Sequence, residues 1–170
     1  MRIRPYIESK DYKYLAKWID NERIHAFWCA NRIPYPITLQ TFHDFLESIS
    51  ENWTESAFVA TEDNGQAVGF FCYSINAENN IGFLKFVMID KAKRGKGYGK
   101  EMLNLALQYA FRITGAESVQ LNVFAENTSA KHCYEKVGFV EKHVEKDIFA
   151  YKDELWSRCN MVVSKEAVEK

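Results

Sequence analysis

Hydrophobic and polar positions change their spacing several times along the chain, and each change predicts a new helix or strand. Residues 39–52 carry apolar side chains at helical spacing, and a shorter helix is expected over residues 9–20. Two apolar runs at strand spacing flank Asp63-Asn64-Gly65, which is a strong signal for a hairpin turn. The strands expected in this half of the chain are residues 1–5, 56–62, 66–76 and 81–90.

The second half of the chain begins with a glycine-rich segment and returns to helical spacing at residues 97–113. A helix between two strands of one sheet makes a crossover, so the strands at residues 81–90 and 119–124 are expected to be parallel. The remaining elements are a helix at residues 128–137 and two final strands, 139–144 and 155–163, joined by a charged connection. The stripe expected to be buried on the helix at 97–113 is Leu103, Ala106, Ala110 and Ile113.

These elements predict an α+β fold with a mixed, mostly antiparallel sheet of about seven strands around a central parallel pair, flanked by about four helices. The length of 170 residues fits a single domain over 1–170. Hydrophobic residues make up 47% of the chain and charged residues 26%, which is typical of an ordinary globular protein.

Charge and cysteine content narrow the classes of function. A net charge of -1 gives no general attraction to nucleic acid or to an anionic membrane. The first residues predict a strand rather than a signal peptide, and no apolar run approaches the ~20 residues of a membrane span. The four cysteines form no CxxC pair, which favours reduced thiols and a cytoplasmic protein without a metal site.

The glycine-rich segment between the strand at 81–90 and the next helix is the first sign of chemistry. Gly95, Gly97 and Gly99 alternate at the start of a helix, so backbone N–H groups can approach a phosphate closely. A Walker loop would need glycine where Arg94 stands, and a dinucleotide fingerprint would need glycine at Lys100. The sequence therefore argues against a Walker-type nucleotidase and a dinucleotide dehydrogenase.

Two motifs together resemble the GNAT superfamily of N-acetyltransferases. The first is R-x-x-G-x-G, which begins at Arg94. The second is N-x-x-A-x-x-x-Y-x-x-x-G-F, which runs from Asn127 through Tyr134 to Phe139. The two segments occur in order and are joined by one helix. The early helices and the last strand loosely resemble the branch that acetylates the N-termini of ribosomal proteins.

The resemblance implies that acetyl-CoA is the co-substrate and that no metal is needed. In the family the parallel pair of strands splays apart, and the pantetheine arm of acetyl-CoA lies in the gap. The pyrophosphate binds to the glycine loop. Carried over to this chain, the cofactor-binding residues are Val87, Met88, Ile89, Arg94, Gly95, Lys96, Gly97, Tyr98, Gly99, Lys100, Asn127 and Tyr134.

The resemblance also implies direct transfer of the acetyl group to a primary amine in a ternary complex. Tyr134 is the candidate general acid for the departing thiolate. Many family members carry a basic carboxylate on the strand before the loop, but in this chain Lys85 is the one charged residue of that strand. The general base stays open between Glu22, His25, Asp44, Glu126 and a water molecule that leads to bulk solvent.

The acceptor is a small molecule or the N-terminus of a protein or peptide. Trp28 and Tyr35, which flank a proline-containing loop, are the residues expected to face the substrate cleft. A monomer or a homodimer fits the sequence. The competing interpretation is an acyl-CoA-binding sensor or partner module that has lost catalysis, which the missing strand carboxylate favours and Tyr134 opposes.

Overall fold

The computed structural model describes residues 1–53 and 55–168, without the side chains of residues 52 and 53. Seven strands form one mixed sheet in the order β1-β2-β3-β4-β5-β7-β6. All neighbours are antiparallel except β4 and β5. The strands are β1 Arg2–Pro5, β2 Ser56–Thr61, β3 Ala67–Asn76, β4 Ile81–Ile89, β5 Ser118–Phe124, β6 Val140–Tyr151 and β7 Glu154–Ser164. The predicted α+β class and the central parallel pair are confirmed.

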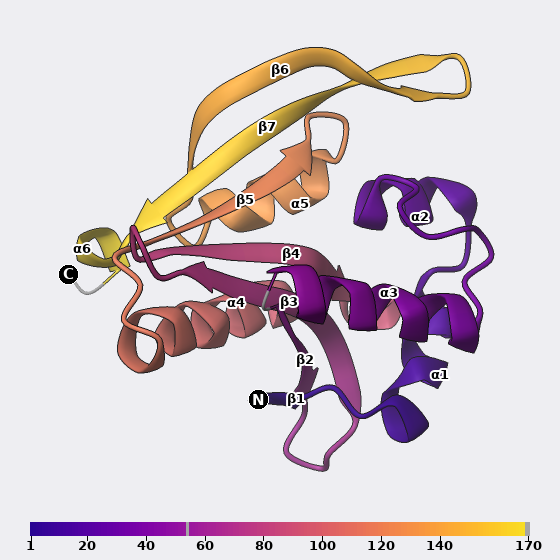
Figure 1. Ribbon diagram of the computed structural model, residues 1–170, viewed down its shortest axis with the longest axis horizontal. Helices are drawn as coiled ribbons and strands as arrows, with labels where there is room; N and C mark the ends of the chain where they lie inside the picture. Colours follow the sequence, from indigo (N-terminus) through magenta and orange to yellow (C-terminus); the bar gives the residue numbers. More distant parts are fainter. Residues whose placement is uncertain (54, 169–170) are drawn as a thin grey trace.

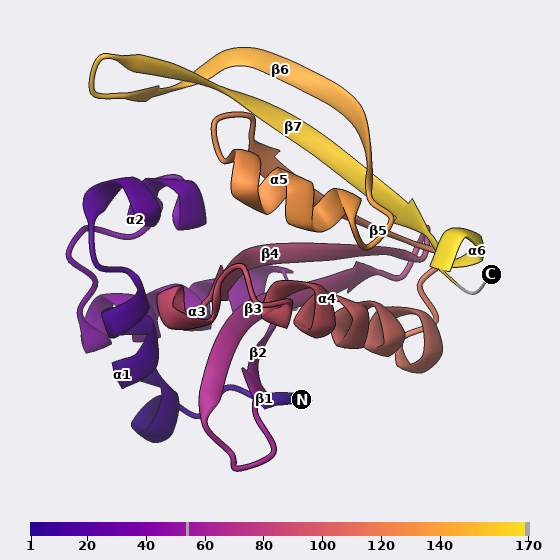
Figure 2. The same ribbon diagram turned by 180° about the vertical axis from the view of Figure 1, so that it is seen from behind.

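Six α-helices are described. They are α1 Glu8–Trp18, α2 Glu22–Cys29, α3 Leu39–Trp53, α4 Tyr98–Gln108, α5 Thr128–Glu135 and α6 Lys165–Val168. In Figures 1 and 2, α3 lies against one face of the sheet, whereas α4 and α5 lie against the other. No helix within residues 1–53 and 55–168 is long and apolar enough to cross a membrane.

Each face of the sheet has its own hydrophobic core. The larger core packs α4 and α5 onto the sheet through residues such as Leu103, Leu107 and Leu121. The second core packs α1 to α3 around Phe42 and Phe70. Strands β2, β3 and β4 contribute side chains to both cores, so both layers of helices hold β4 in place together with its neighbours.

The helix predicted at residues 97–113 is not regular to its end. The α-helix α4 stops at Gln108, and residues Tyr109–Ile113 form one wider π-helical turn. A π turn adds a residue to the turn, so it displaces the side chains that follow from the expected face. Leu103, Ala106 and Ala110 are buried as predicted, but the prediction for Ile113 was wrong, since its side chain is 73% exposed.

The last two strands are much longer than predicted. Instead of a charged connection between residues 144 and 155, β6 and β7 continue into a hairpin whose turn is Lys152-Asp153. The prediction failed because β6 is an edge strand with most of its side chains exposed, so it has no apolar alternation to detect. The hairpin extends past the sheet toward α2 (Figure 1).

An aromatic cluster connects this hairpin to α2. The Phe27 ring of α2 stacks on Trp156 of β7 at 4.4 Å between centroids. The Arg23 guanidinium lies 5.1 Å from the Trp156 ring centroid and binds Glu154 with two hydrogen bonds of 2.5 and 3.0 Å. These contacts set the position of the hairpin turn relative to the first turn of α2.

Candidate active site

The parallel strands β4 and β5 separate halfway along their length. Ladder pairing joins Ile81–Leu84 to Ser118–Leu121 and ends there. From Leu84 onward β4 continues beside β3 alone, and β5 continues beside β7 alone. The predicted splay is therefore present. Val87, Met88 and Ile89 lie on the part of β4 that has no strand on its β5 side.

A bulge in β4 marks the point where the split begins. The register between β3 and β4 shifts between Phe70 and Cys72, and Phe86 has a positive φ of 52°. Such a backbone conformation is strained for an aromatic residue and occurs most often at functional sites. The Trp28 indole N–H donates a 2.8 Å hydrogen bond to the Phe86 carbonyl. This bond holds the bulge from the side of α2.

Trp28 therefore lies in the core rather than in an open cleft. Its side chain is 7% exposed and packs edge-on against Phe70 and Phe86. The expectation that Trp28 faces the cleft was wrong, because the indole N–H finds a carbonyl acceptor inside the protein. Tyr35 does line a pocket, as described below.

The glycine loop presents a row of backbone donors. Gly95 and Gly97 have φ of 74° and 88°, and α4 begins directly after Gly97. Within the described residues, the N–H groups of residues 95–97 donate no hydrogen bond. The first N–H to bond inside α4 is that of Glu101, to the Gly97 carbonyl at 3.0 Å. Six consecutive N–H groups, from residue 95 to residue 100, are thus available to an anion.

The loop also fits a diphosphate sterically and in charge. A Cβ at Gly95 or Gly97 would meet nothing within 4 Å, so the space beside these two residues is open. The exposed side chains of Arg94, Lys96 and Lys100 add positive charge. Arg94 Nε donates to the Ile89 carbonyl at 3.1 Å, which ties the loop back to β4. The residues present therefore fit the pyrophosphate of acetyl-CoA.

No sequence pattern indicates the residue that braces this loop. Glu62, at the end of β2, accepts 2.5 Å hydrogen bonds from Lys93 Nζ and from the Tyr98 hydroxyl. Lys93 precedes the loop and Tyr98 follows it, so one carboxylate fixes both ends. The two donors lower the pKa of Glu62. Its partners are 31 and 36 residues away along the chain, so no local pattern could reveal the brace.

Helix α5, which carries Tyr134, packs through Cys133 against Gly99 at the start of α4. Asn127 caps this helix by accepting a hydrogen bond from the Ala130 N–H at 3.4 Å. A Cβ at Gly99 would lie 3.0 Å from Cys133 Sγ, so α4 and α5 pack closely because residue 99 is glycine. Tyr134 is 7% exposed, and burial raises the pKa of its hydroxyl, which therefore stays protonated in neutral solution.

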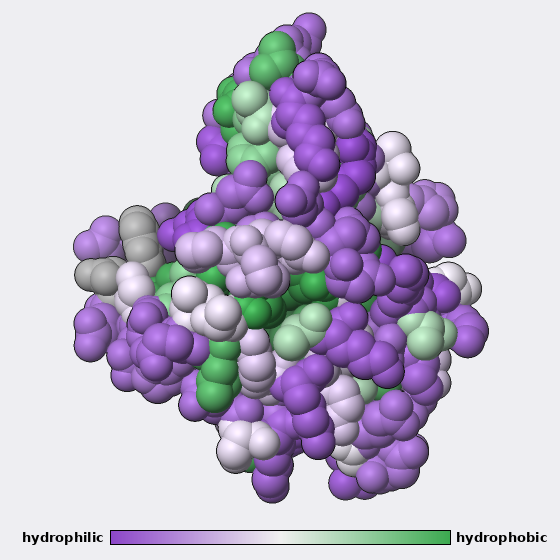
Figure 3. All heavy atoms as spheres, turned by 90° about the vertical axis from the view of Figure 1, so that its right-hand side faces the viewer, coloured by the Kyte–Doolittle hydropathy of each residue, from purple (hydrophilic) through white to green (hydrophobic). Residues whose placement is uncertain are grey.

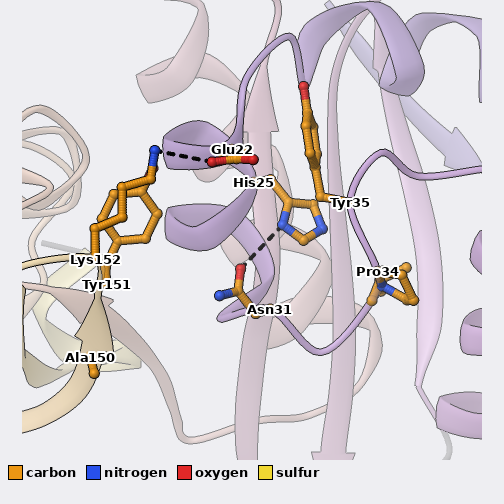
Figure 4. A pocket seen from close by; sticks show the side chains of 9 residues that line it. Glu22, His25, Asn31, Pro34, Tyr35, Ala150, Tyr151 and Lys152 are labelled. Carbon is orange, nitrogen blue, oxygen red and sulfur yellow. Dashed lines mark hydrogen bonds and ion pairs between the residues drawn. The ribbon is translucent and has the colours of Figure 1, made fainter.

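A pocket with a volume of about 330 Å³ lies between the start of α2, the loop after it and the β6–β7 turn (Figure 4). Helix α2 also contacts both separated strands, through Trp28 to β4 and through Phe27, whose ring lies 6.5 Å from Phe124 of β5. The pocket is therefore on the helix that contacts both separated strands, although its lining residues come from α2, the loop after it and the β6–β7 hairpin. Its lining consists of Glu22, His25, Asn31, Ile33, Pro34, Tyr35, Ala150, Tyr151 and Lys152.

Figure 3 shows the side of the molecule that is on the right in Figure 1. Its upper part projects above the rest of the protein, and hydrophobic side chains are set into the surface below this projection. The pocket is apolar in part, through Ile33, Pro34 and Ala150. It also brings together three residues predicted for the site, namely Glu22, His25 and Tyr35. Asp44 and Glu126 are not among its lining residues.

His25 is bound on both ring nitrogens. Its Nδ1 lies 3.3 Å from the Asn31 side-chain oxygen and its Nε2 lies 3.3 Å from Cys29 Sγ. An amide oxygen only accepts, so Nδ1 carries the proton and Nε2 accepts from the Cys29 thiol. Burial lowers the pKa of His25, which keeps the ring neutral, and raises the pKa of Cys29. The ring is thus a fixed wall of the pocket.

The other base candidates lie in different places. Glu22 lines the pocket, and its Oε2 is 3.1 Å from Lys152 Nζ (Figure 4). Glu126 follows β5; its Oε1 accepts from the Ser157 N–H at 3.2 Å, and its Oε2 is buried with no hydrogen-bond partner in the described residues. Asp44 lies on α3, where it accepts a hydrogen bond from Gln40 at 2.6 Å.

Known proteins share this sequence and fold. The family model described as "Acetyltransferase (GNAT) family" matches residues 21–139, which is more than half of the chain. A spermidine N(1)-acetyltransferase of Vibrio cholerae is 27% identical over 145 residues, covering 84% of this chain and 82% of the relative. The spermidine N(1)-acetyltransferase of Escherichia coli K12 is 25% identical over 139 residues, covering 82% and 72%.

A solved structure of similar fold is spermidine N-acetyltransferase from Vibrio cholerae in complex with CoA and spermine. It has a TM-score of 0.84 and 22% sequence identity, with 99% of this chain and 98% of that chain covered. The family match over residues 21–139 agrees with two features of the structure. These are the splayed strands and the glycine loop with its free N–H groups. The chain therefore belongs to the GNAT family of acetyltransferases, which acetylate amines with acetyl-CoA as the acetyl donor.

Proposed function

We propose that this enzyme transfers the acetyl group directly to a primary amine in a ternary complex, without an acetylated protein intermediate. The observation that carries the proposal is the position of the split in the sheet. The glycine loop and the helix of Tyr134 flank it, and α2, which contacts both separated strands, brings the pocket beside it. Two substrates could thus approach one reaction point from different sides.

In this proposal the chain binds acetyl-CoA through two kinds of backbone group. The N–H groups of residues 95–100 bind the pyrophosphate, assisted by the side chains of Arg94, Lys96 and Lys100. The unpaired edge of β4 at Val87, Met88 and Ile89 binds the pantetheine arm as a neighbouring strand would. Asn127 caps α5 at the same end and orients the arm or an ordered water molecule.

Three protein groups move or hold protons and charge. Glu22 accepts the proton of the incoming ammonium, which leaves a neutral amine to form the C–N bond. Of the two candidate donors, Met88 and Ile89, the ladder turns the Met88 N–H toward β3, since the Asp90 N–H two residues on bonds the Val68 carbonyl. The Ile89 N–H therefore donates the hydrogen bond to the thioester oxygen as negative charge develops there. As the C–S bond breaks, the Tyr134 hydroxyl gives its proton to the sulfur. The second proton lost by the nitrogen restores the Tyr134 hydroxyl, and the proton taken by Glu22 is released to solvent.

Glu22 is preferred over His25 as the base for a reason of hydrogen bonding. The proton on His25 Nδ1 and the lone pair on Nε2 are both engaged inside the protein, so the ring has no free site for a substrate proton. Glu22 is 58% exposed, and its partner Lys152 is 63% exposed, so their ion pair exchanges readily with solvent or ligand. His25 and Tyr35 shape the wall of the pocket.

The acceptor is a small molecule or a peptide N-terminus, and the spermidine acetyltransferases among the relatives make polyamines one candidate.

The test of the proposed function is release of free thiol from acetyl-CoA over a panel of primary amines, with the acetylated amine identified by mass spectrometry. The proposal predicts thiol release and acetylated amine in equal amounts. Thermal stabilisation by acetyl-CoA without acetylation of any amine would instead indicate a binding module.

A further inference from the structure

The charges that line the acceptor pocket distinguish between classes of amine. Among the described residues that line it, Glu22 and Lys152 are the charged side chains, since His25 is neutral. Glu22 Oε2 and Lys152 Nζ are 3.1 Å apart at the mouth of the pocket. The pocket thus presents one negative and one positive group side by side, with no net charge.

A ligand that matches this arrangement carries one group of each sign on neighbouring atoms. An α-amino acid has its ammonium and its carboxylate on the same carbon, so its ammonium can pair with Glu22 while its carboxylate pairs with Lys152. The exposed Glu22–Lys152 ion pair is then replaced by two ion pairs between the protein and the ligand. A polyamine carries positive charges only, and it would place one of them near Lys152 without a second carboxylate to compensate.

The geometry of the neighbouring residues fits the same ligand. Lys152 lies in the two-residue turn between β6 and β7, which the Arg23–Glu154 pair and the Phe27–Trp156 stack hold against α2. The fold therefore keeps the backbones of Glu22 and Lys152 near each other even when their side chains are not paired. Beyond the two charges, Ile33, Pro34 and Ala150 offer apolar surface to a side chain.

We infer that the acceptor is an α-amino acid, whose α-amine is acetylated while Lys152 binds its carboxylate. The inference rests on the proposed function, because it assumes that the pocket receives the amine. Lys152 is then a specificity-determining residue, and Glu22 receives the proton of the α-ammonium. The bonds formed and broken are those of the proposed transfer.

The experiment compares amino acids with the amines that differ from them only by loss of the carboxylate. The pairs are alanine with ethylamine, leucine with 3-methylbutylamine and phenylalanine with 2-phenylethylamine, with spermidine as the polycation. We expect kcat/KM for thiol release to be at least about tenfold higher for the amino acid in the preferred pair, which is the effect of one charged hydrogen bond. Calorimetric titration of the same pair into the CoA-bound protein should show the same preference.

Variants of Lys152 connect this preference to the pocket. Lys152→Met should bring the ratio of kcat/KM for the amino acid to kcat/KM for its matched amine within about twofold of one. Lys152→Arg should preserve the wild-type ratio. Lys146→Met, on β6 of the same hairpin but outside the pocket lining, is the matched control and should also preserve it. Because both positions are on the surface hairpin, melting temperatures identify any of the three variants that has lost its fold.

Two results would overturn the inference and leave the proposed function intact. One is a higher kcat/KM for spermidine, or for the amines without carboxylate, than for the amino acids. The other is a preference for amino acids that Lys152→Met does not change. Absence of acetylation with every amine, in protein that acetyl-CoA stabilises, would contradict the proposed function itself and the inference with it.

Discussion

At the scale of single residues, the environment of each polar group decides what it can do. Tyr134 and His25 are both nearly enclosed, yet burial acts on them in opposite ways. Burial disfavours the charged form, so it raises the pKa of the Tyr134 hydroxyl and lowers the pKa of the His25 imidazole. The Tyr134 hydroxyl therefore stays protonated and can donate a proton, and the His25 imidazole stays neutral.

Replacement of Tyr134 by Phe tests its role as general acid. We expect kcat to fall about 100-fold with little change in KM for acetyl-CoA, because the hydroxyl acts on the leaving sulfur and not in binding. Since its pKa is raised above the ordinary 10, the wild-type rate should not fall through deprotonation of Tyr134 below pH 10. Tyr73→Phe, which removes a hydroxyl bound to Thr114 far from the loop, is the control. An unchanged kcat in Tyr134→Phe at every pH would refute the assignment.

The neutral state of His25 predicts a pH dependence of stability. Its pKa is lower in the folded protein than the ordinary 6.5, so below about pH 6.5 the unfolded chain binds a proton that the folded chain does not. Stability should therefore fall as the pH falls from 7.5 to 5.5. Thermal unfolding should show a smaller fall for His25→Asn than for the wild type. The exposed His143→Asn serves as the control, and equal losses in all three proteins would show that His25 is not held neutral.

At the scale of elements, the site depends on contacts that hold β4 and the glycine loop. The bulge at Phe86 has its carbonyl bound by Trp28, and the loop has both ends bound by Glu62. Neither contact belongs to the sheet ladder or to a helix. Both lie where the backbone departs from regular structure in order to open the site.

Replacement of Trp28 by Phe keeps an aromatic ring and removes the hydrogen bond. The Phe86 carbonyl is then buried without a donor, which costs about 1–3 kcal/mol in free energy of unfolding. Trp18→Phe, a buried tryptophan of the same core whose indole donates no hydrogen bond among the described residues, is the matched control. Urea denaturation should show the larger loss for Trp28→Phe, together with lower kcat/KM. Equal losses in the two variants would mean that the indole N–H does not stabilise the bulge.

Removal of the Glu62 carboxylate frees both ends of the glycine loop. We expect Glu62→Ala to raise KM for acetyl-CoA about tenfold with kcat little changed, because the loop must then be ordered by the ligand. Lys93→Met and Tyr98→Phe should each give part of this effect. Glu78→Ala, in the next turn of the chain, should have none. An unaltered KM in Glu62→Ala would show that the loop keeps its shape without the brace.

At the scale of the whole molecule, local patterns predicted the fold better than the pocket. The parallel pair, the glycine loop and α5 were predicted because glycine positions and apolar spacing act over a few residues. The length of the β6–β7 hairpin was missed because an exposed edge strand needs no apolar alternation. The Glu22–Lys152 and Glu62–Lys93 pairs join residues distant in sequence, and the burial of Trp28 depends on a carbonyl in another element.

The central claim is that the acetyl group passes directly from acetyl-CoA to the amine while both are bound. It is tested most directly by initial rates measured over a grid of acetyl-CoA and amine concentrations, with intact-mass spectrometry of protein mixed with acetyl-CoA alone. Direct transfer predicts intersecting double-reciprocal lines and a protein mass that does not change. Parallel lines, together with a protein heavier by one acetyl group that loses it when amine is added, would contradict the account.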